Sequence, residues 1–216
     1  MRMICLNARM LLFFWNYFKK INFALLLIDE INNEERTSYI KQLTNRLNDY
    51  NRDLGFHIVN GNTKAELIIT ANGNPYLFKE VELLVHYAPS IARWKIVAFI
   101  QPERNLSKYE SGTDKPLEYH GISLRISEMY FLPIENTIKS SDLGIRVFLK
   151  NYIVHKDNPR LREAVYVHIE HLIGEKAFAN DLFFIEIDQL KNEDLEDDCV
   201  LELYNLKFFI DSFEYD

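Results

Sequence analysis

The spacing of apolar and polar residues predicts a helical start to the chain. Residues 11–28 place large apolar side chains three or four positions apart, which is typical of one buried helix face. Residues 33–36 (NEER) resemble a helix cap and first turn, and the apolar positions after them predict a second, surface helix to about Asp49. We therefore interpret residues 1–52 as a helical segment.

The stretch from Phe56 to Gln101 predicts the order strand, strand, helix, strand. Two short apolar runs flank Asn-Gly-Asn at positions 60–62, which is a strong signal for a β-hairpin. Asn74 and Pro75 suit the cap and first position of the following helix. Residues 94–100 are apolar on both faces, which predicts a central strand.

The remainder mixes strands and helices without strict alternation. The run from Leu201 to Phe213 permits either a helix or a strand, and we favour a helix. The other predictions are a polar loop at 102–115, strands at 117–127, 129–134 and 143–152, a turn at 140–142, a helix from 157–159 to Gly174, a strand at 182–187 and an acidic loop at 192–198.

These elements predict the α+β class, with helices packed on a mixed, largely antiparallel sheet. No internal repeat or linker interrupts the pattern, so residues 1–216 are predicted to form a single domain. In this interpretation residues 53–188 hold the sheet, and residues 189–216 form an acidic loop and a C-terminal segment.

Composition and charge narrow the classes of function. The 216 residues are 48% hydrophobic with a formal net charge of −7, which argues against nucleic-acid binding. An acidic surface fits either solubility or a partner with a basic surface, and the charge does not select between them. Lys19 and Lys20 interrupt the N-terminal apolar run and no small-residue cleavage site follows, so we expect a cytoplasmic protein with no membrane partner. The two cysteines are too few for a disulfide framework. Oligomeric state does not follow from these features.

Few residues suggest chemistry. His168 and His171 share one helix face, near Glu170 and Glu175, but the spacing is not HExxH and His168 lies on the apolar stripe. The Asn72–Pro75 corner lacks the glycines and lysine of a phosphate-binding loop, and residues 193–198 lack the spacing of a calcium loop. No nucleophile motif occurs, and we expect no cofactor, metal or catalytic residue.

The aromatic cluster near the N-terminus has two interpretations. It can dock the first helix on a sheet, or it can present a surface to a partner. Trp94 has the same two interpretations at the start of a strand. The candidate binding residues are Trp15, Glu66, Trp94, His168, His171 and Glu175.

Several separated blocks resemble a family of uncharacterised bacterial (Bacteroidetes-like) proteins. The blocks are FWNYF, ELIITANGN, YAPSIARWKIVAF, YHGISL and LIGEKAF, and they match that family's FWxxF, ELIITAxG, AP–WK–AF and Gly-Glu pattern in order. The chain departs from the pattern at Asn72, where an acidic residue is common, and at Lys176-Ala177, where an aromatic-acidic pair is common. The resemblance implies no activity. Gly174 and Glu175 are the residues that match the family's pattern, its Gly-Glu pair, most directly.

Two hypotheses of function follow. The first is a non-catalytic interaction protein, one version being an immunity-type protein whose acidic surface covers a basic toxin or nuclease. The second is a small-molecule-binding protein or enzyme whose site uses Glu66, Glu175, His168 or His171, with perturbed pKa values where they converge.

Overall fold

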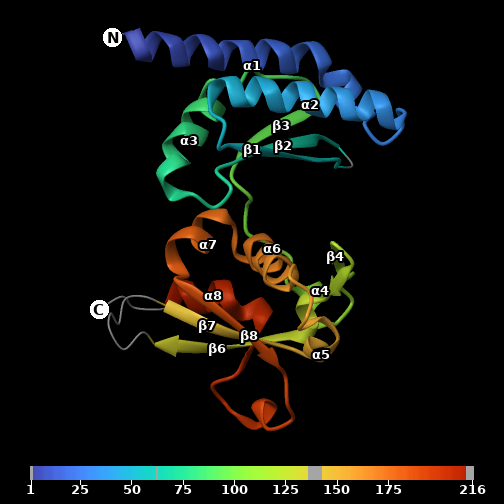
Figure 1. Cartoon of the computed structure of the whole chain (residues 1–216), viewed down its shortest axis with the longest axis vertical. Coiled ribbons are helices and arrows are strands. Elements are labelled where there is room, and N and C mark those ends of the chain that lie inside the picture. Colours follow the sequence, from blue (N-terminus) through green and yellow to red (C-terminus); the bar gives the residue numbers. More distant parts are fainter. Residues whose placement is uncertain (1, 62, 136–142, 213–216) are drawn as a thin grey trace. The chain divides into compact units, whose positions relative to one another are not determined.

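The computed structural model of the chain describes residues 2–61, 63–135 and 143–212. The contacts divide the chain into two compact units, an N-terminal unit of residues 1–100 and a C-terminal unit of residues 101–216. Both units combine helices with strands, so the predicted α+β class is confirmed (Figure 1). The boundary after Ile100 falls inside the predicted segment 53–188, where the sequence shows no composition change.

The N-terminal unit packs its helices on a three-stranded sheet. Figure 1 shows α1 along the outer edge of this unit with α2 beside it. The first helix begins at Arg2, nine residues before the apolar spacing predicts, and ends at Leu26. The elements are α1 (Arg2–Leu26), α2 (Asn33–Tyr50), β1 (Gly55–Val59), β2 (Ala65–Thr70), η1 (Pro75–Leu77), α3 (Phe78–His86) and β3 (Trp94–Ala98).

The sheet of this unit has the order β1-β2-β3. β1 and β2 form the predicted antiparallel hairpin, with Phe56 opposite Ile69, and β3 runs parallel to β2. Asn62 of the predicted turn lies outside the described residues. The prediction that residues 94–100 form a central strand is wrong, because β2 is central and β3 lies at an edge. Partial burial of both faces of β3 explains its apolar run without a second neighbouring strand.

Asparagine side chains cap two helical elements of this unit, α2 and η1. The side chain of Asn32 accepts a hydrogen bond from the backbone N–H of Glu35 at 2.9 Å, which caps α2. The side chain of Asn74 accepts one from the N–H of Tyr76 at 3.1 Å, and Pro75 takes the first helical position. The interpretation of this corner as a turn plus cap is therefore confirmed.

One apolar core joins the helices of the N-terminal unit to its sheet. Trp15 donates its indole N–H to the carbonyl oxygen of Leu84 at 3.0 Å, which ties α1 to α3. The ring of Phe18 lies 4.9 Å from that of Trp94, which ties α1 to β3. Other buried members are Phe14, Leu25, Leu43, Leu47, Leu67, Ile69 and Val81.

The C-terminal unit has its own sheet, with the order β8-β7-β6-β9, and a separate β4-β5 hairpin. β6 is antiparallel to β7 and to β9, and β7 is parallel to β8. Its elements are α4 (Ser107–Glu110), β4 (Leu117–Tyr119), β5 (Ile122–Leu124), η2 (Ile126–Glu128), β6 (Met129–Glu135), β7 (Leu143–Leu149), α5 (Tyr152–His155), α6 (Leu161–Ile173), α7 (Glu175–Asp181), β8 (Phe184–Gln189), η3 (Asp194–Glu196), β9 (Leu201–Glu202), η4 (Leu203–Asn205) and α8 (Leu206–Ser212).

Several boundaries in this unit differ from the prediction. The predicted loop at 102–115 contains the short helix α4, the strand predicted at 143–152 ends at Leu149, and the helix predicted from 157–159 begins at Leu161. The strand predicted at 117–127 is divided by a turn at His120 and Gly121, both of which have positive φ. The helix that ends at Gly174 is followed at once by α7, which the sequence did not predict. The last helix begins at Leu206, after the short strand β9. The predicted turn at 140–142 lies outside the described residues.

A second apolar core lies within the C-terminal unit. Val165, Ile169 and Leu172 on α6 are fully buried, as their spacing predicts. They pack in one cluster with the strands, represented by Phe131, Ile145 and Val147. Across residues 2–61, 63–135 and 143–212, no helix combines the length and apolar character that crossing a membrane requires.

Candidate functional site

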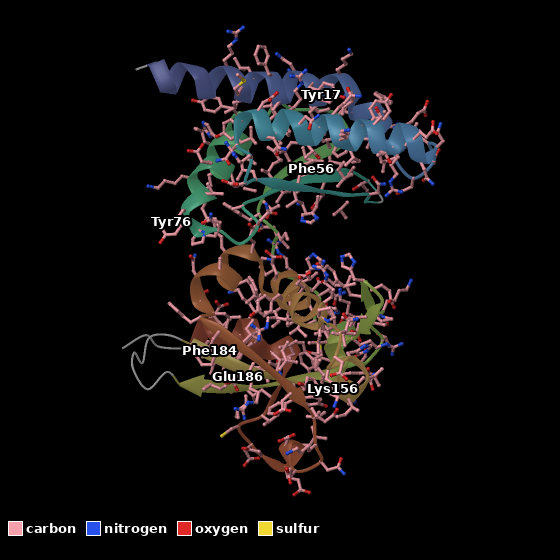
Figure 2. The ribbon with its side chains drawn as sticks, in the orientation of Figure 1. Tyr17, Phe56, Tyr76, Lys156, Phe184 and Glu186 are labelled. Atoms are coloured by element: carbon pink, nitrogen blue, oxygen red, sulfur yellow. The ribbon has the colours of Figure 1, made fainter. Side chains whose placement is uncertain are left out.

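A groove of about 940 Å³ in the N-terminal unit, between α2 and the strand β1, could receive a ligand. Its apolar part comes from Ile40 and Leu47 on α2 and from Phe56 and Ile58 on β1. Figure 2 labels Phe56 on this strand. Polar side chains line the remainder, among them Asn33, Arg36, Thr37, Lys41, Thr44 and Asn60. The groove therefore combines an apolar surface with a polar margin.

Polar contacts fix one end of the groove. The guanidinium of Arg36 lies 3.5 Å from the carboxylate of Asp29, and the side-chain amide of Asn60 donates to the same carboxylate at 3.0 Å. These contacts join the start of α2 to the end of β1 through the segment that follows α1. Because both partners of the ion pair are more than half exposed, its contribution to stability is small.

Lys41 gives the groove a positive charge. The carboxylate of Asp29 offsets the charge of Arg36, whereas Lys41 has no acidic partner within the part of the chain that the structure describes. The Lys41 side chain is exposed, one turn after the exposed Thr37 on α2. An acidic group in the groove would therefore meet an ammonium group that pairs with no acidic side chain among the described residues.

The β1 side of the groove is the edge of a sheet. β1 pairs with β2 from Gly55–Thr70 to Val59–Glu66, and no other strand pairs with it within the described ranges. Alternate N–H and C=O groups of an edge strand point away from its only neighbour. β1 can therefore hydrogen-bond to a further extended segment.

The candidate residues Trp15 and Trp94 belong to the core of the N-terminal unit. They are 2% and 4% exposed, and both rings pack against Phe18. The structure thus shows the docking interpretation of the aromatic cluster for Trp15, Phe14 and Phe18. Phe13, on the opposite side of α1, is 41% exposed.

Glu66 lies on β2, outside the groove. Its carboxylate accepts a hydrogen bond from the ammonium of Lys95 on β3 at 2.7 Å, between residues that are direct neighbours in the parallel register. This cross-strand ion pair is partly exposed, and it occupies the carboxylate.

His168 is a buried residue of the C-terminal core, 1% exposed. Its Nδ1 lies 2.6 Å from the carbonyl oxygen of Ala164, and its Nε2 lies 3.1 Å from that of Leu124. Both ring nitrogens are thus occupied, which leaves none to bind a metal ion. His171 is exposed on the same helix. No group of three or more His, Cys, Asp or Glu side chains in the described residues could hold a metal ion.

Glu170 and Glu175 are the two carboxylates near the junction of α6 and α7. Glu175 is fully buried at the first position of α7, directly after Gly174, and Glu170 is half-buried. Burial raises the pKa of Glu170 to about 7, and the charge of Glu175 raises this pKa further. Of the residues named from the sequence, Glu170 and Glu175 are the pair that the structure brings into electrostatic contact.

None of the six candidate binding residues lines the groove. The sequence reasoning treated Ile40 and Leu47 as the buried face of a helix, and Phe56 and Ile58 as strand residues. One signal in the sequence could have indicated the groove. The predicted hairpin gives its first strand one neighbour, the second strand, and the sequence predicts no other neighbour for it. The position of α2 relative to that strand depends on tertiary packing, which residue spacing does not specify.

Comparison with protein-family models, with curated proteins and with solved structures finds no match to this chain. The resemblance to the uncharacterised bacterial family therefore stays an expectation from the sequence, and the geometry of the groove is the basis for a functional proposal.

Proposed function

We propose that this chain is a non-catalytic interaction protein whose α2–β1 groove binds an extended segment of a partner protein. The observation that carries the proposal is a groove of about 940 Å³ beside the edge strand β1. A volume of this size also suits a small ligand. The neighbouring strand edge favours a polypeptide, because it offers backbone hydrogen bonds along its whole length.

The dimensions of the strand set the length of the bound segment. β1 has five residues, and a strand rises about 3.4 Å per residue, so a partner segment of roughly five residues can pair along it. Alternate side chains of that segment would face Ile40, Phe56 and Ile58. We therefore expect a segment with apolar residues at every second position.

Selection of displayed random peptides on the immobilised chain tests this proposal. We expect enrichment of sequences with apolar residues at alternate positions. Thr37→Trp places a large ring on an exposed helix position that lines the groove, and it should weaken the binding of selected peptides roughly tenfold or more, about 1.4 kcal/mol.

Ser38→Trp is the matched control, because Ser38 is the next residue of α2, is also exposed and does not line the groove. Binding to this variant should equal binding to the native chain. Selected peptides that bind both tryptophan variants as tightly as the native chain would contradict the proposal, and so would a failure to enrich any peptide.

The immunity-type version of this proposal concerns the other unit. Residues 101–216 contain 23 Asp and Glu and 13 Lys and Arg, which gives a formal charge of −10. Residues 1–100 contain 9 Asp and Glu and 12 Lys and Arg, which gives +3. The excess of acidic residues in the C-terminal unit supports a partner with a basic surface. Capture from the native host should recover such a partner in a stoichiometric amount, and salt should release it. Repeated recovery of the chain alone would contradict this version.

A second candidate is a small-molecule site or enzyme at the α6–α7 junction. The raised pKa of Glu170, near 7, favours it, because general acids and bases work best at such values. A metabolite panel followed by thermal unfolding tests it. A ligand that raises the melting temperature of the native chain but not of Glu170→Gln would support a site there, and a panel without such a ligand would count against it.

A further inference from the structure

The N-terminal helix α1 carries an outer face that is both apolar and cationic. Its opposite face, with Phe14, Trp15 and Phe18, is buried in the core, so the orientation of the helix is fixed. The outer face nevertheless exposes large apolar side chains that no described element of the N-terminal unit covers. They are Leu12 (58% exposed), Phe13 (41%), Phe23 (67%) and Leu27 (46%), the last just beyond the helix end.

The charged residues on this outer face are all cations. Arg9, Lys19 and Lys20 are exposed between or beside the apolar residues, and no Asp or Glu occurs before Asp29. The guanidinium of Arg9 lies 5.2 Å from the centre of the Phe13 ring. Neither Lys19 nor Lys20 has an acidic partner in the described ranges. On a chain of net charge −7, this face is a local region of positive charge.

We propose that the outer face of α1 binds the surface of an anionic lipid bilayer. The helix has 25 residues, a length of about 37 Å, so it can lie flat on the headgroup region with Phe23 and Leu12 inserted among the acyl chains. The flexible stems of Lys19 and Lys20 would follow the apolar surface while their ammonium groups reach lipid phosphates. The outer position of α1 in its unit leaves this face accessible (Figure 1).

The shape of the face favours a lipid surface over a protein partner. Protein interfaces place their main contributions in complementary pockets, whereas this face is the convex surface of a single helix. A bilayer deforms around such a surface and supplies a continuous negative charge. The sequence predicts no membrane partner, on the grounds that the N-terminal apolar run is interrupted and no cleavage site follows it. This proposal departs from that prediction. The present proposal concerns a helix that lies in the interface, and it is independent of the α2–β1 groove.

Vesicle flotation tests the proposal with the full chain. Vesicles of phosphatidylcholine alone are compared with vesicles that also contain phosphatidylglycerol. We expect the chain to float with the anionic vesicles only. Binding should fall when salt is raised from about 0.1 M to about 1 M, which shortens the Debye length from about 10 Å to about 3 Å.

Two variants and two matched controls locate the contact. Lys19→Gln combined with Lys20→Gln should lower partitioning into anionic vesicles roughly tenfold or more, and Phe23→Ser should lower it severalfold. Phe208→Ser changes an equally protruding phenylalanine on α8, 77% exposed, and Lys156→Gln removes an exposed charge of the C-terminal unit. Figure 2 labels Lys156. Both controls should partition as the native chain does.

Three results would overturn the proposal. They are the absence of flotation with anionic vesicles, equal flotation with both kinds of vesicle, and unchanged partitioning of Phe23→Ser. Light scattering on the free chain supplies a further check. A concentration-dependent dimer that Phe23→Ser dissolves would mean that a second copy covers this face.

Discussion

The two tryptophans show how the same residue type can occupy different environments in one core. Both rings pack against the ring of Phe18. The distance between ring centres is 6.0 Å for Trp15 and 4.9 Å for Trp94. The indole N–H of Trp15 donates to the carbonyl oxygen of Leu84, whereas that of Trp94 is buried without a hydrogen-bond partner among the described residues. A buried donor without a partner costs about 1–3 kcal/mol.

Replacing each tryptophan by phenylalanine should therefore have unequal effects on the free energy of unfolding. Both changes remove similar volume, but Trp15→Phe also loses a hydrogen bond and leaves the Leu84 carbonyl unpaired. We expect Trp15→Phe to cost about 2–3 kcal/mol, and Trp94→Phe roughly 1–2 kcal/mol less. Urea unfolding measures both values. Equal losses would show that the two N–H groups contribute alike.

Glu170 should make stability depend on pH. Its pKa rises from 4.5 to about 7 in the folded chain, so the folded state favours the protonated carboxyl. The resulting stabilisation is fully present below pH 4.5 and is lost as pH rises through about 7. Glu170→Gln should remove this dependence. Because the side chain is partly exposed, the variant should be more stable than the native chain at pH 8 by only about 1 kcal/mol.

Urea unfolding at pH 5 and pH 8 checks this expectation. Glu118→Gln, which changes an exposed carboxylate on β4, is the control and should leave the pH dependence of the native chain intact. If Glu170→Gln lost stability between pH 5 and pH 8 as the native chain does, the carboxyl of Glu170 would not be responsible.

At the scale of elements, the pairing of β7 with β8 requires a glycine. Gly144 lies opposite Phe184 in the parallel register, and a Cβ atom on Gly144 would overlap the ring of Phe184. Figure 2 labels Phe184 on β8. Gly144→Ala should therefore lower the free energy of unfolding by about 1–3 kcal/mol, as overpacking does.

A double mutant separates this overlap from other effects of alanine. Phe184→Ala removes the ring that a new Cβ would meet. The combination with Gly144→Ala should cost less than the sum of the two single changes, by at least about 0.5 kcal/mol. Additive losses in urea unfolding would assign the effect to the backbone of β7.

Local patterns were sufficient to predict most elements of this chain. The hairpin of β1 and β2, the Asn74–Pro75 helix start and the helix end at Gly174 follow from turn and cap chemistry that acts within a few residues. The edge position of β3 was predicted wrongly, because burial of both faces does not require a second neighbouring strand. α7 was missed because Gly174 ends one helix and begins the next within a single residue.

The candidate site was less predictable than the elements. Sequence reasoning selected residues with reactive or aromatic side chains, and the structure shows Trp15, Trp94 and His168 to be buried. The groove depends instead on the packing of α2 against β1, which places Lys41 and Phe56, 15 residues apart in the sequence, in the lining of one groove. Ordinary helix and strand residues form it, so no motif marks it.

At the scale of the whole molecule, charge and apolar contacts divide at the same place. Each unit has a separate core, and the formal charge changes from +3 in residues 1–100 to −10 in residues 101–216. A charge difference of this size can direct different partners to the two units. The basic outer face of α1 belongs to the first unit, and the acidic segment 193–198 belongs to the second.

The separate cores imply that each unit can fold without the other. Among the residues that the structure describes, each strand pair and each of the two buried clusters lies within one unit, and a fragment that ends at Ile100 or begins at Gln101 cuts none of them. We therefore expect fragments 1–100 and 101–216 each to unfold cooperatively in urea. At pH 7 the first should bind a cation exchanger and the second an anion exchanger, because their charges have opposite signs. A fragment 101–216 without a cooperative transition would mean that its core of Val165, Ile169 and Phe131 depends on residues 1–100.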